Sequence, residues 1–459
     1  MTSRRLANKT MVRPSARPSK MPKSRTVENR LPHRLGGKKL LIMGANPETA
    51  VLVQTARDMG VYTVVTDYDH HAYAKKFADK ACDVDGMDVP GLVALARAEG
   101  VDGVLVGVAD PLVPSYCKVC DALGFPCYAT QAIGDVFTQK DRFKSKCEEY
   151  GIHGIPEYYL DADVRKEDVA RIEFPVMVKP VDSTSGTGMT VCYKTDELVP
   201  AVSKALSVSR GKRFIVEKYM ECDDMGLYYT FKDGICSASC IYDRYTTNEQ
   251  PGLSRVCLGG TYPSKHIGTY FDRMHPNALR LFRDMGIRNG VLMLSAFFKD
   301  GEFFVYDTGF HLQGEAPHLL MKAIHGFDQR EMLIRFALTG SQGDLDLAAA
   351  DDAYFRGKHA ATLWFLLRAG TIGQIEGLET AASDPALVGL VQRFYKGDTV
   401  KQEWVGTEKQ VLARLYIVCE TKQELGAKLR SFMASVKVLN IKGEDMLLRG
   451  FDVAAALGQ

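Results

Sequence analysis

The 459-residue sequence lacks the long apolar runs and the disulfide pattern that would place it in a membrane or outside the cell. None of its apolar runs approaches the roughly 18–20 residues that a membrane-spanning helix needs, so we expect no membrane partner. The 11 cysteines are an odd number without a secretion signal, which predicts reduced thiols and a cytoplasmic location. Cys117 and Cys120 have the spacing of a metal knuckle, but no second CxxC pair is present, so buried thiols are the favoured interpretation.

Acidic residues are nearly absent from the first 39 residues, which contain 12 lysines and arginines and a single acid, Glu28. This segment is rich in proline and serine and has almost no apolar periodicity, so residues 1–37 are expected to form a disordered basic tail. An organellar transit peptide would explain the lack of acids but not the prolines, and a true start at Met11 or Met21 is a second explanation. A nucleic-acid-binding arm ranks last because nothing downstream supports it, and we expect no nucleic-acid partner.

The dinucleotide-binding fingerprint G-x-G-x-x-G is also missing after the first predicted strand, which argues against nicotinamide binding. Residues 38–135 otherwise predict a Rossmann-like α/β domain. Short, continuous apolar runs at 40–43 and 61–65 are typical of parallel strands buried on both faces, and we expect further strands at 101–110 and near 126–128. Ligands bind such a sheet at the carboxyl ends of its strands.

The most informative stretch that is present is FPVMVKPVDSTSGTGM at 174–189. A short apolar strand is expected to end in Lys179, and a polar loop with glycines follows it. Glycines let backbone N–H groups converge on phosphate oxygens and the lysine adds a positive charge, so the stretch predicts a polyphosphate clamp. A surface hairpin with a solvated lysine explains it equally well when it is read alone. The loop residues expected to contact phosphate are Ser183, Ser185, Gly186 and Gly188.

Two other segments predict contacts with the same kind of ligand. Lys140 lies just inside a predicted helix that follows the Rossmann-like unit. An apolar strand at 214–220 contains Glu217 and runs into an acidic linker that holds Asp224. Such a strand offers backbone N–H and C=O groups to a purine edge, while Glu217 can accept from the exocyclic amine through a bridging group and Asp224 can reach ribose hydroxyls. Each segment is weak evidence alone, and their order along the chain strengthens the prediction.

That order resembles the ATP-grasp superfamily, and within it the carboxylate–amine ligases. The resemblance covers residues 38–459 and rests on Gln139-Lys140-Asp141, on the VKP strand with its glycine loop, and on the VEKY strand. It implies an α/β and α+β fold. The expected parts are a Rossmann-like preATP-grasp domain over 38–135, a two-lobed ATP-grasp domain over 136–345 and a small C-terminal α+β module over 346–459.

The resemblance further implies an ATP site. Lys140, Lys179 and the loop at 183–188 would hold the phosphates, because two or more cations must neutralise a transferring phosphoryl group. The adenine would lie against the backbone of the hinge strand, and Asp224 would take the ribose. The hinge residues concerned are Glu217, Lys218, Tyr219 and Met220.

The metal site departs from the family's pattern. The family has a glutamate on the first of two paired strands and Glu-x-Asn-x-Arg on the second. This chain has Ser295 at the first position and Asp-Thr-Gly-Phe-His, residues 307–311, at the second. We expect Asp307 to hold Mg²⁺ (or Mn²⁺), with Glu315 as a second ligand if its loop folds back, because hard cations need oxygen ligands. Phosphate and water would then supply most of the remaining ligands.

Three basic side chains are candidates for the catalytic step. His311 replaces the family's arginine; it would be partly neutral near pH 7 and would clamp a carboxylate or acyl phosphate more weakly. A structural histidine at a strand end is an equal alternative. Arg244 and Arg255, from the central strands, are candidates for substrate recognition and could equally be surface arginines.

The resemblance implies an ATP-dependent ligase that activates a carboxylate as an acyl phosphate for attack by an amine or similar nucleophile, with ADP and phosphate as products. Its partners would be small-molecule carboxylate and amine substrates, and a homodimer is the family-based expectation. The alternative is an ATP-binding subunit with a degenerate metal site and a regulatory or assembly role, which Ser295 and Gly309 favour. A carboxylase or carbamoyl-phosphate-type enzyme shares the machinery, but the sequence has no recognisable biotinyl-carrier or amidotransferase region.

Overall fold

A parallel sheet begins the part of the chain that the computed structural model describes, residues 35–182, 188–247 and 255–458. Its strands run in the order β3-β2-β1-β4, and all three pairings are parallel. The runs at β1, β2 and β4 are short, apolar and almost fully buried, as the sequence predicts for a Rossmann-like unit. The four strands are β1 (Lys39–Met43), β2 (Tyr62–Thr66), β3 (Lys80–Cys82) and β4 (Gly103–Val106).

Helices connect these strands, so the carboxyl ends of β1, β2 and β4 lie at one edge of the sheet. The strand expected near 126–128 does not form. Tyr128 instead packs its ring against Tyr116, with centroids 5.0 Å apart, and its hydroxyl donates to the carbonyl of Phe310 at 3.2 Å. The connecting elements are α1 (Thr49–Asp58), η1 (Tyr73–Phe77), α2 (Val89–Glu99), η2 (Asp110–Leu112) and α3 (Val113–Leu123).

A small antiparallel sheet of order β5-β8-β6-β7 follows. The apolar face of α7 covers it, because Leu198, Ala201 and Val202 bury against Val176 and Val178. The strands are β5 (Glu157–Tyr158), β6 (Val176–Pro180), β7 (Thr190–Cys192) and β8 (Phe214–Lys218). The helices of this region are α4 (Gln131–Thr138), α5 (Lys140–Glu148), α6 (Lys166–Val169), η3 (Thr195–Glu197) and α7 (Leu198–Val208).

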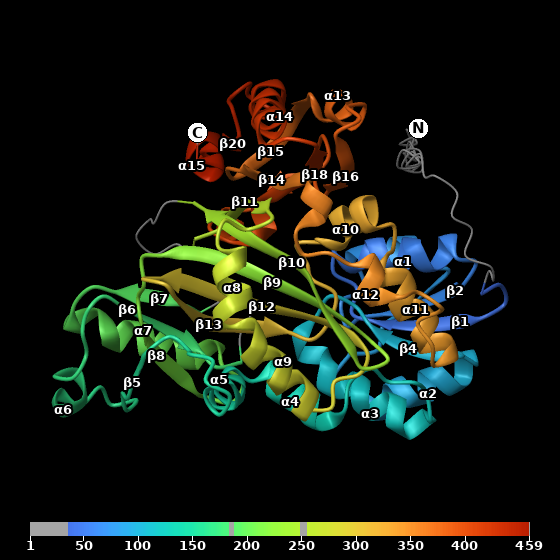
Figure 1. Ribbon diagram of the computed structural model, residues 1–459, viewed down its shortest axis with the longest axis horizontal. Coiled ribbons are helices and arrows are strands. Elements are labelled where there is room, and N and C mark those ends of the chain that lie inside the picture. The colour runs from blue at the N-terminus through green and yellow to red at the C-terminus, as the bar shows by residue number, and fades with distance from the viewer. Residues whose placement is uncertain (1–34, 183–187, 248–254, 459) are drawn as a thin grey trace, which may run out of the picture. The chain divides into compact units, whose positions relative to one another are not determined.

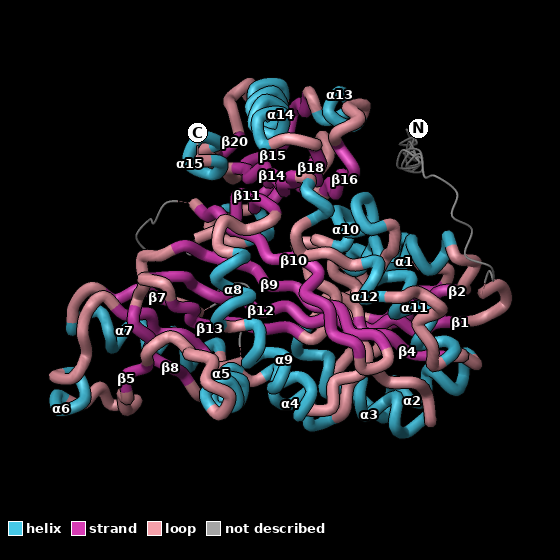
Figure 2. Tube along the Cα trace, in the orientation of Figure 1, coloured by secondary structure: helices cyan, strands magenta, loops and turns pink. Residues whose placement is uncertain are grey.

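The largest element is a nine-stranded sheet of order β13-β12-β9-β10-β11-β14-β18-β16, with β20 paired to β14, and its neighbouring strands run side by side in Figure 2. Helices α8 and α9 lie on one face (Figure 1), where Phe282 meets Phe231 edge-on at 5.5 Å. The first five strands are β9 (Asp223–Lys232), β10 (Ile235–Thr246), β11 (Cys257–Tyr262), β12 (Gly290–Lys299) and β13 (Glu302–Gly309). The helices after them are α8 (Ile267–Arg273), α9 (His275–Asp284), α10 (His318–His325), α11 (Gln329–Thr339) and α12 (Leu347–Ala350).

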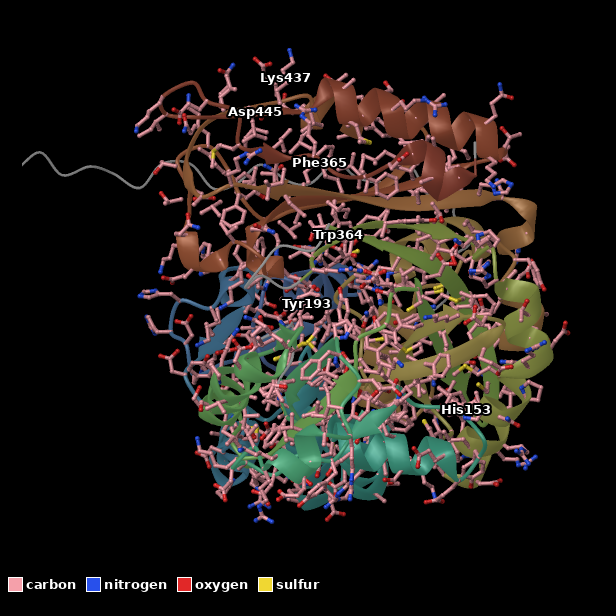
Figure 3. All side chains as sticks on the ribbon, turned by 90° about the vertical axis from the view of Figure 1, so that its left-hand side faces the viewer. His153, Tyr193, Trp364, Phe365, Lys437 and Asp445 are labelled. Atoms are coloured by element: carbon pink, nitrogen blue, oxygen red, sulfur yellow. The ribbon has the colours of Figure 1, made fainter. Side chains whose placement is uncertain are left out.

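The C-terminal part shares this sheet, because β11 pairs with β14. Phe365 lies on the side of β14 that faces α14, and Trp364 lies on the other side (Figure 3). The remaining strands are β14 (His359–Leu367), β15 (Gly370–Glu376), β16 (Leu387–Gln392), β17 (Thr399–Val400), β18 (Val411–Cys419), β19 (Lys437–Asn440) and β20 (Leu447–Leu448). The remaining helices are η4 (Phe355–Gly357), α13 (Leu378–Ala382), η5 (Gln402–Trp404), η6 (Glu408–Gln410), α14 (Lys422–Ser435) and α15 (Val453–Leu457).

Within the described ranges, no helix combines the length and apolar character needed to cross a membrane.

Candidate functional site

Glu217 is a buried carboxylate that forms ion pairs with two lysines. Only 2% of its side chain is exposed, and its Oε2 lies 2.5 Å from Lys179 Nζ. Its Oε1 accepts from Lys144 Nζ at 2.6 Å. The register of β6 and β8 pairs Met177 with Glu217, so Lys179, two residues further along β6, lies on the same face as the carboxylate. Lys144 reaches Glu217 from α5.

Burial and charge oppose each other at this cluster. Burial would raise the pKa of Glu217, but the charges of Lys179 and Lys144 outweigh it, so the pKa is lowered and the group is ionised. The pKa of Lys179 is lowered, and burial is the largest cause. The charge of Glu217 opposes this shift, while the charges of Lys140 and Lys144 add to it. Lys144 also contacts the carboxylate of Glu157, so it shares its charge between two glutamates, while Lys179 pairs with Glu217 alone.

Lys140 and Asp307 form a second ion pair beside the first. Lys140 is the first residue of α5, and its Nζ lies 2.7 Å from Asp307 Oδ1 on β13. Burial would lower the pKa of Lys140, but Asp307 outweighs it and raises that pKa. Burial would raise the pKa of Asp307, but Lys140 and, next, Lys179 outweigh it and lower that pKa. Three segments far apart in sequence thus place Lys140, Lys179 and Asp307 in one site.

The strands next to Asp307 provide no second carboxylate for a metal ion at the positions that the sequence singled out. The β12–β13 register pairs Ser295 with Asp307, so these two side chains share a face, and Ser295 has no carboxylate. Two residues further along β13, Gly309 has no side-chain oxygen. Among the residues described, no group of three or more His, Cys, Asp or Glu side chains could hold a metal ion. Protein side chains alone therefore do not build a closed metal cage at Asp307.

His311 uses both of its ring nitrogens in hydrogen bonds. Nε2 lies 2.6 Å from Asp110 Oδ1, and Nδ1 lies 2.6 Å from the carbonyl oxygen of Leu312. Both partners accept hydrogen bonds, so both nitrogens carry protons and the ring is an imidazolium. Burial would lower the pKa of His311, but Asp110 outweighs it and raises that pKa. The raised pKa argues against the expected partly neutral clamp, and the buried ring held by Asp110 agrees with the alternative of a structural histidine at a strand end.

Arg244 lies in a buried network and not on the surface. Its Nη1 donates to Asp224 Oδ1 at 3.1 Å and to the Tyr306 hydroxyl at 2.9 Å. The Tyr306 hydroxyl also donates to Asp224 Oδ1 at 2.8 Å. Burial raises the pKa of Asp224, although Arg244 opposes the shift. The expected contact of Asp224 with ribose hydroxyls stays a prediction, and both internal contacts of this carboxylate are made through Oδ1.

Glu315 belongs to the same network. Its Oε1 lies 3.0 Å from Arg244 Nε, and its Oε2 accepts from the hydroxyl of Tyr242. Both carboxylate oxygens of Glu315 are therefore engaged inside the protein. This corrects the expectation that Glu315 folds back to assist Asp307 as a metal ligand.

The hinge strand also differs from the expectation that its backbone is free. The N–H group of Lys218 donates to the carbonyl of Pro156 at 2.9 Å, and that of Tyr219 donates to the carbonyl of Pro175 at 3.0 Å. These two donors already have partners inside the protein. A purine edge bound here would have to use other groups of the hinge, and Met220 lies just beyond the end of β8.

Two cationic side chains flank the hinge. The Lys218 ammonium donates to Glu173 at 2.8 Å on the surface. The Arg255 guanidinium lies over the ring of Tyr219, 5.4 Å from the centroid, in a cation–π contact. The structure therefore places Arg255 at the hinge and Arg244 in the buried network, and not together at one substrate group.

Only the end of the predicted phosphate loop is described, since Ser183, Ser185 and Gly186 lie outside the described residues. Gly188 has a φ of +80°, which glycine adopts without strain. A Cβ at this position would come within 2.8 Å of Pro180 Cγ and 3.1 Å of Val208 Cβ. Gly188 is thus required both by its backbone conformation and by close packing against the strand that carries Lys179.

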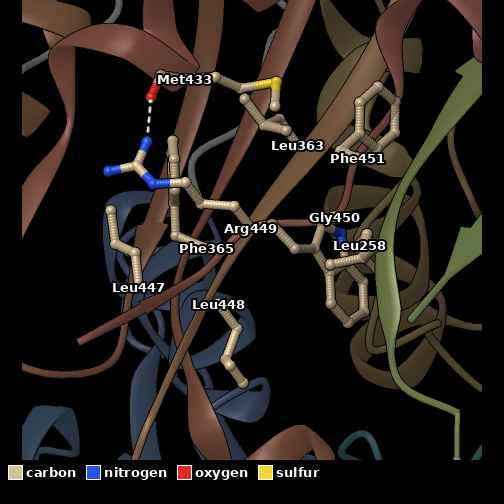
Figure 4. A pocket seen from close by; sticks show the side chains of 10 residues that line it. Leu258, Leu363, Phe365, Met433, Leu447, Leu448, Arg449, Gly450 and Phe451 are labelled. Carbon is tan, nitrogen blue, oxygen red and sulfur yellow. Dashed lines mark hydrogen bonds between the residues drawn. The ribbon is translucent and has the colours of Figure 1, made fainter. Parts of the chain in front are cut away.

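A pocket in the C-terminal part is unrelated to these charges (Figure 4). Its wall is apolar apart from Arg449, whose Nη1 donates to the carbonyl of Met433 at 3.2 Å. None of the predicted site residues lines it. The lysine and carboxylate cluster is therefore the better candidate for a functional site.

Known structures resemble this chain along most of its length. An L-amino acid ligase from Bacillus licheniformis superposes with a TM-score of 0.70 at 16% identity, covering 88% of this chain and 99% of that one. A phosphoribosylglycinamide synthetase from Anaerococcus prevotii gives 0.68 at 15% identity, with coverage of 88% and 99%. The family described as D-ala D-ala ligase C-terminus matches residues 156–233, which contain the glycine loop and the hinge strand. The chain therefore has the fold of these ATP-grasp ligases, and its residues 156–233 match one of their families.

Curated relatives match a shorter region of this chain. The formate-dependent phosphoribosylglycinamide formyltransferase of Actinobacillus pleuropneumoniae serotype 3 (strain JL03) is 25% identical over 196 residues, 42% of this chain and 50% of that protein. The mitochondrial methylcrotonoyl-CoA carboxylase subunit alpha of Glycine max is 27% identical over 211 residues, 41% of this chain and 28% of that protein. The chain therefore spans half or less of the length of these relatives.

Sequence reasoning missed two residues of this charged cluster. Lys144 binds Glu217, and its spacing of four residues from Lys140 on a predicted helix was an available signal. Asp110 binds His311, and its place at the end of a predicted parallel strand pointed to the ligand-binding edge of the first sheet. Neither signal identifies the partner side chain unless it is known which elements pack together.

Proposed function

We propose that this ATP-grasp chain is an ATP-dependent ligase that activates a carboxylate as an acyl phosphate for attack by an amine or similar nucleophile. ADP and phosphate would be the other products. The observation that carries the proposal is the convergence of Lys140, Lys144 and Lys179 on Glu217 and Asp307. Lysines that carboxylates hold in fixed positions are suited to phosphates, since an ammonium group donates charge-assisted hydrogen bonds to phosphate oxygens.

The residues present fit a nucleotide with a divalent cation. Lys179 is a buried cation whose pKa burial lowers, so bound phosphate would stabilise its charged form. Asp307 is an ionised carboxylate next to both lysines and could hold Mg²⁺ or Mn²⁺ together with phosphate oxygens. In support, the biotin carboxylase domain of a 2-oxoglutarate carboxylase from Hydrogenobacter thermophilus, with a TM-score of 0.69 at 16% identity, was solved with MgADP.

Each side chain would have a distinct task in the ligase. ATP would supply the phosphoryl group that converts the carboxylate into a reactive acyl phosphate. Lys140 and Lys179 would orient the phosphates and offset charge that develops during transfer. Glu217 would hold the ammonium of Lys179 in position, and His311 would contribute a fixed positive charge near Asp307.

A second candidate function is favoured by one observation. Ser295 stands opposite Asp307, so the paired strands provide a single carboxylate for a metal ion on that face. An ATP-binding subunit with a regulatory or assembly role would need no complete metal site. This function predicts nucleotide binding without substrate-stimulated turnover.

The test is a screen for ADP release over pairs of small carboxylates and amines, with Mg²⁺ or Mn²⁺ present. The ligase function predicts release that depends on both substrates and falls at least about 100-fold in Asp307→Asn, where the charge but not the shape is lost. Nucleotide binding without stimulation by any pair would favour the regulatory function. If Lys179→Ala keeps both nucleotide binding and turnover, the assignment of the phosphate site is contradicted.

A cytoplasmic location and a homodimer complete the proposal. The neighbour from Hydrogenobacter thermophilus is described as a domain dimer, which supports association through a related surface. Sedimentation velocity over a range of protein concentrations would measure the mass of the species in solution. A monomer at all concentrations would contradict the dimer without affecting the proposed chemistry.

A further inference from the structure

A carboxylate from the first sheet lies in the space that Gly309 leaves open. Asp110 is the first residue of η2, just beyond the carboxyl end of β4. A Cβ added to Gly309 would lie 2.8 Å from Asp110 Oδ1 and 3.2 Å from His311 Nε2. The φ of Gly309 lies outside the left-handed region, so its backbone does not require glycine. What requires glycine at this position is the room taken by the Asp110 carboxylate.

Asp110 and Asp307 lie on the same face of β13, and each binds one cation. Asp307 is bonded to Lys140, and Asp110 is bonded to His311. Asp307 and Gly309 are two residues apart on β13 and share a face, and the Asp110 carboxylate fills the space beside Gly309 on that face. The two carboxylates therefore belong to one site.

We propose that Asp110 supplies the second carboxylate of the divalent-cation site, together with Asp307. This inference rests on the proposed nucleotide-dependent function. A magnesium ion in such sites takes one or two carboxylates and fills its other positions with phosphate oxygens and water. Asp110 supplies the second carboxylate from just beyond β4 of the first sheet. Ser295 and Gly309, on β12 and β13, have no carboxylate to offer.

The arrangement explains why the site has no closed cage of side chains. Two carboxylates hold a cation firmly only when phosphates complete the coordination, so the ion enters with the nucleotide. Each carboxylate has two oxygens, and the contacts to Lys140 and His311 are made through Oδ1. A bound cation would compete with these two positive groups for the same carboxylates.

The experiment measures Mn²⁺ binding by electron paramagnetic resonance in the presence of saturating ADP, for the full chain and its variants. Asp110→Asn is expected to weaken Mn²⁺ binding at least about 10-fold, as loss of a charged oxygen ligand does. The affinity for ADP without metal should change less than about twofold, since Asn keeps an acceptor for His311. Asp102→Asn is the matched control, because Asp102 lies at the amino end of β4, opposite the end that leads to Asp110. This variant should leave Mn²⁺ binding unchanged.

A rescue variant separates a metal ligand from a residue that only positions His311. Asp110→Ala with Gly309→Asn places a side-chain oxygen in the vacated space, and it should recover part of the Mn²⁺ affinity lost in Asp110→Ala. Mn²⁺ affinity in Asp110→Asn equal to wild type would overturn the inference and leave Asp110 as a partner of His311 only. Wild-type protein that binds ADP but no Mn²⁺ would overturn it as well. Wild-type protein that binds no ADP would instead refute the proposed function.

Discussion

At the scale of single residues, charge burial dominates this site. Glu217 and Lys179 are 2% and 4% exposed, so each would lose its hydration without full compensation if its partner were removed. The pair is therefore a poor source of net stability but an effective way to hold an ammonium group in one place. A fixed cation needs no reorganisation when a phosphate arrives.

We expect Glu217→Gln to lower the free energy of unfolding by about 3–5 kcal/mol, because Lys179 and Lys144 would keep their charges inside the protein without the carboxylate. Urea denaturation followed by circular dichroism measures this change. The matched control is Glu173→Gln, which removes the exposed partner of Lys218 and should change stability little. Equal effects of the two variants would show that the buried pair is not coupled as described.

His318 gives stability a predictable dependence on pH. It is 4% exposed, and burial, followed by the charge of Arg330, lowers its pKa to about 3. The unfolded chain binds a proton at His318 below about pH 6.5 while the folded chain does not, so stability is lost as pH falls from 6.5 toward 3. His318→Gln should reduce that slope between pH 6.5 and 4.5 in denaturation experiments. An unchanged slope would mean that His318 is protonated in the folded protein.

At the scale of elements, the sequence predicted much of what positions the site. The apolar runs that end in Lys179 and Glu217 form β6 and β8, and the two paired strands expected to carry Ser295 and Asp307 form β12 and β13. Local periodicity and turn residues suffice for such elements. The partners of Glu217 and His311 could not be predicted, because they depend on how α5 and η2 pack against strands far away in sequence.

Gly188 tests whether the end of the phosphate loop must approach β6 closely. Gly188→Ala should lower the free energy of unfolding by about 1–3 kcal/mol and weaken ADP binding, because of its φ of +80° and the contacts with Pro180 and Val208. Gly268→Ala is the control, since Gly268 lies in α8 with open space around it and alanine favours helices. If both variants bind ADP like wild type, the loop does not carry the phosphate site.

At the scale of the whole molecule, the nine-stranded sheet crosses the boundary expected at residues 345–346. Backbone pairing between β11 and β14 runs from Gly259–Leu363 to Tyr262–Ala360. Two parts that share a continuous sheet lose their hydrogen bonds together when either unfolds. Sequence periodicity gave no sign that β14 extends the preceding sheet, because pairing between strands far apart in sequence leaves no local signature.

Coincident unfolding is therefore expected. Trp364 and Trp404 are the two tryptophans of the chain, and both lie after residue 346. Their fluorescence should follow the same urea transition as the far-ultraviolet circular dichroism of the whole chain. A separate, earlier fluorescence transition would show that the C-terminal part unfolds as an independent unit.

The measurement that tests the central claim most directly follows oxygen from the carboxylate substrate. With the pair that best stimulates ADP release, the carboxylate is labelled with ¹⁸O and the inorganic phosphate is analysed by mass spectrometry. If an acyl phosphate forms, one carboxylate oxygen bonds to the transferred phosphorus, and the amine then displaces phosphate that retains that oxygen. The account predicts one ¹⁸O atom in the released phosphate. Released phosphate without ¹⁸O, whose fourth oxygen comes from water, with ADP still formed, would contradict it.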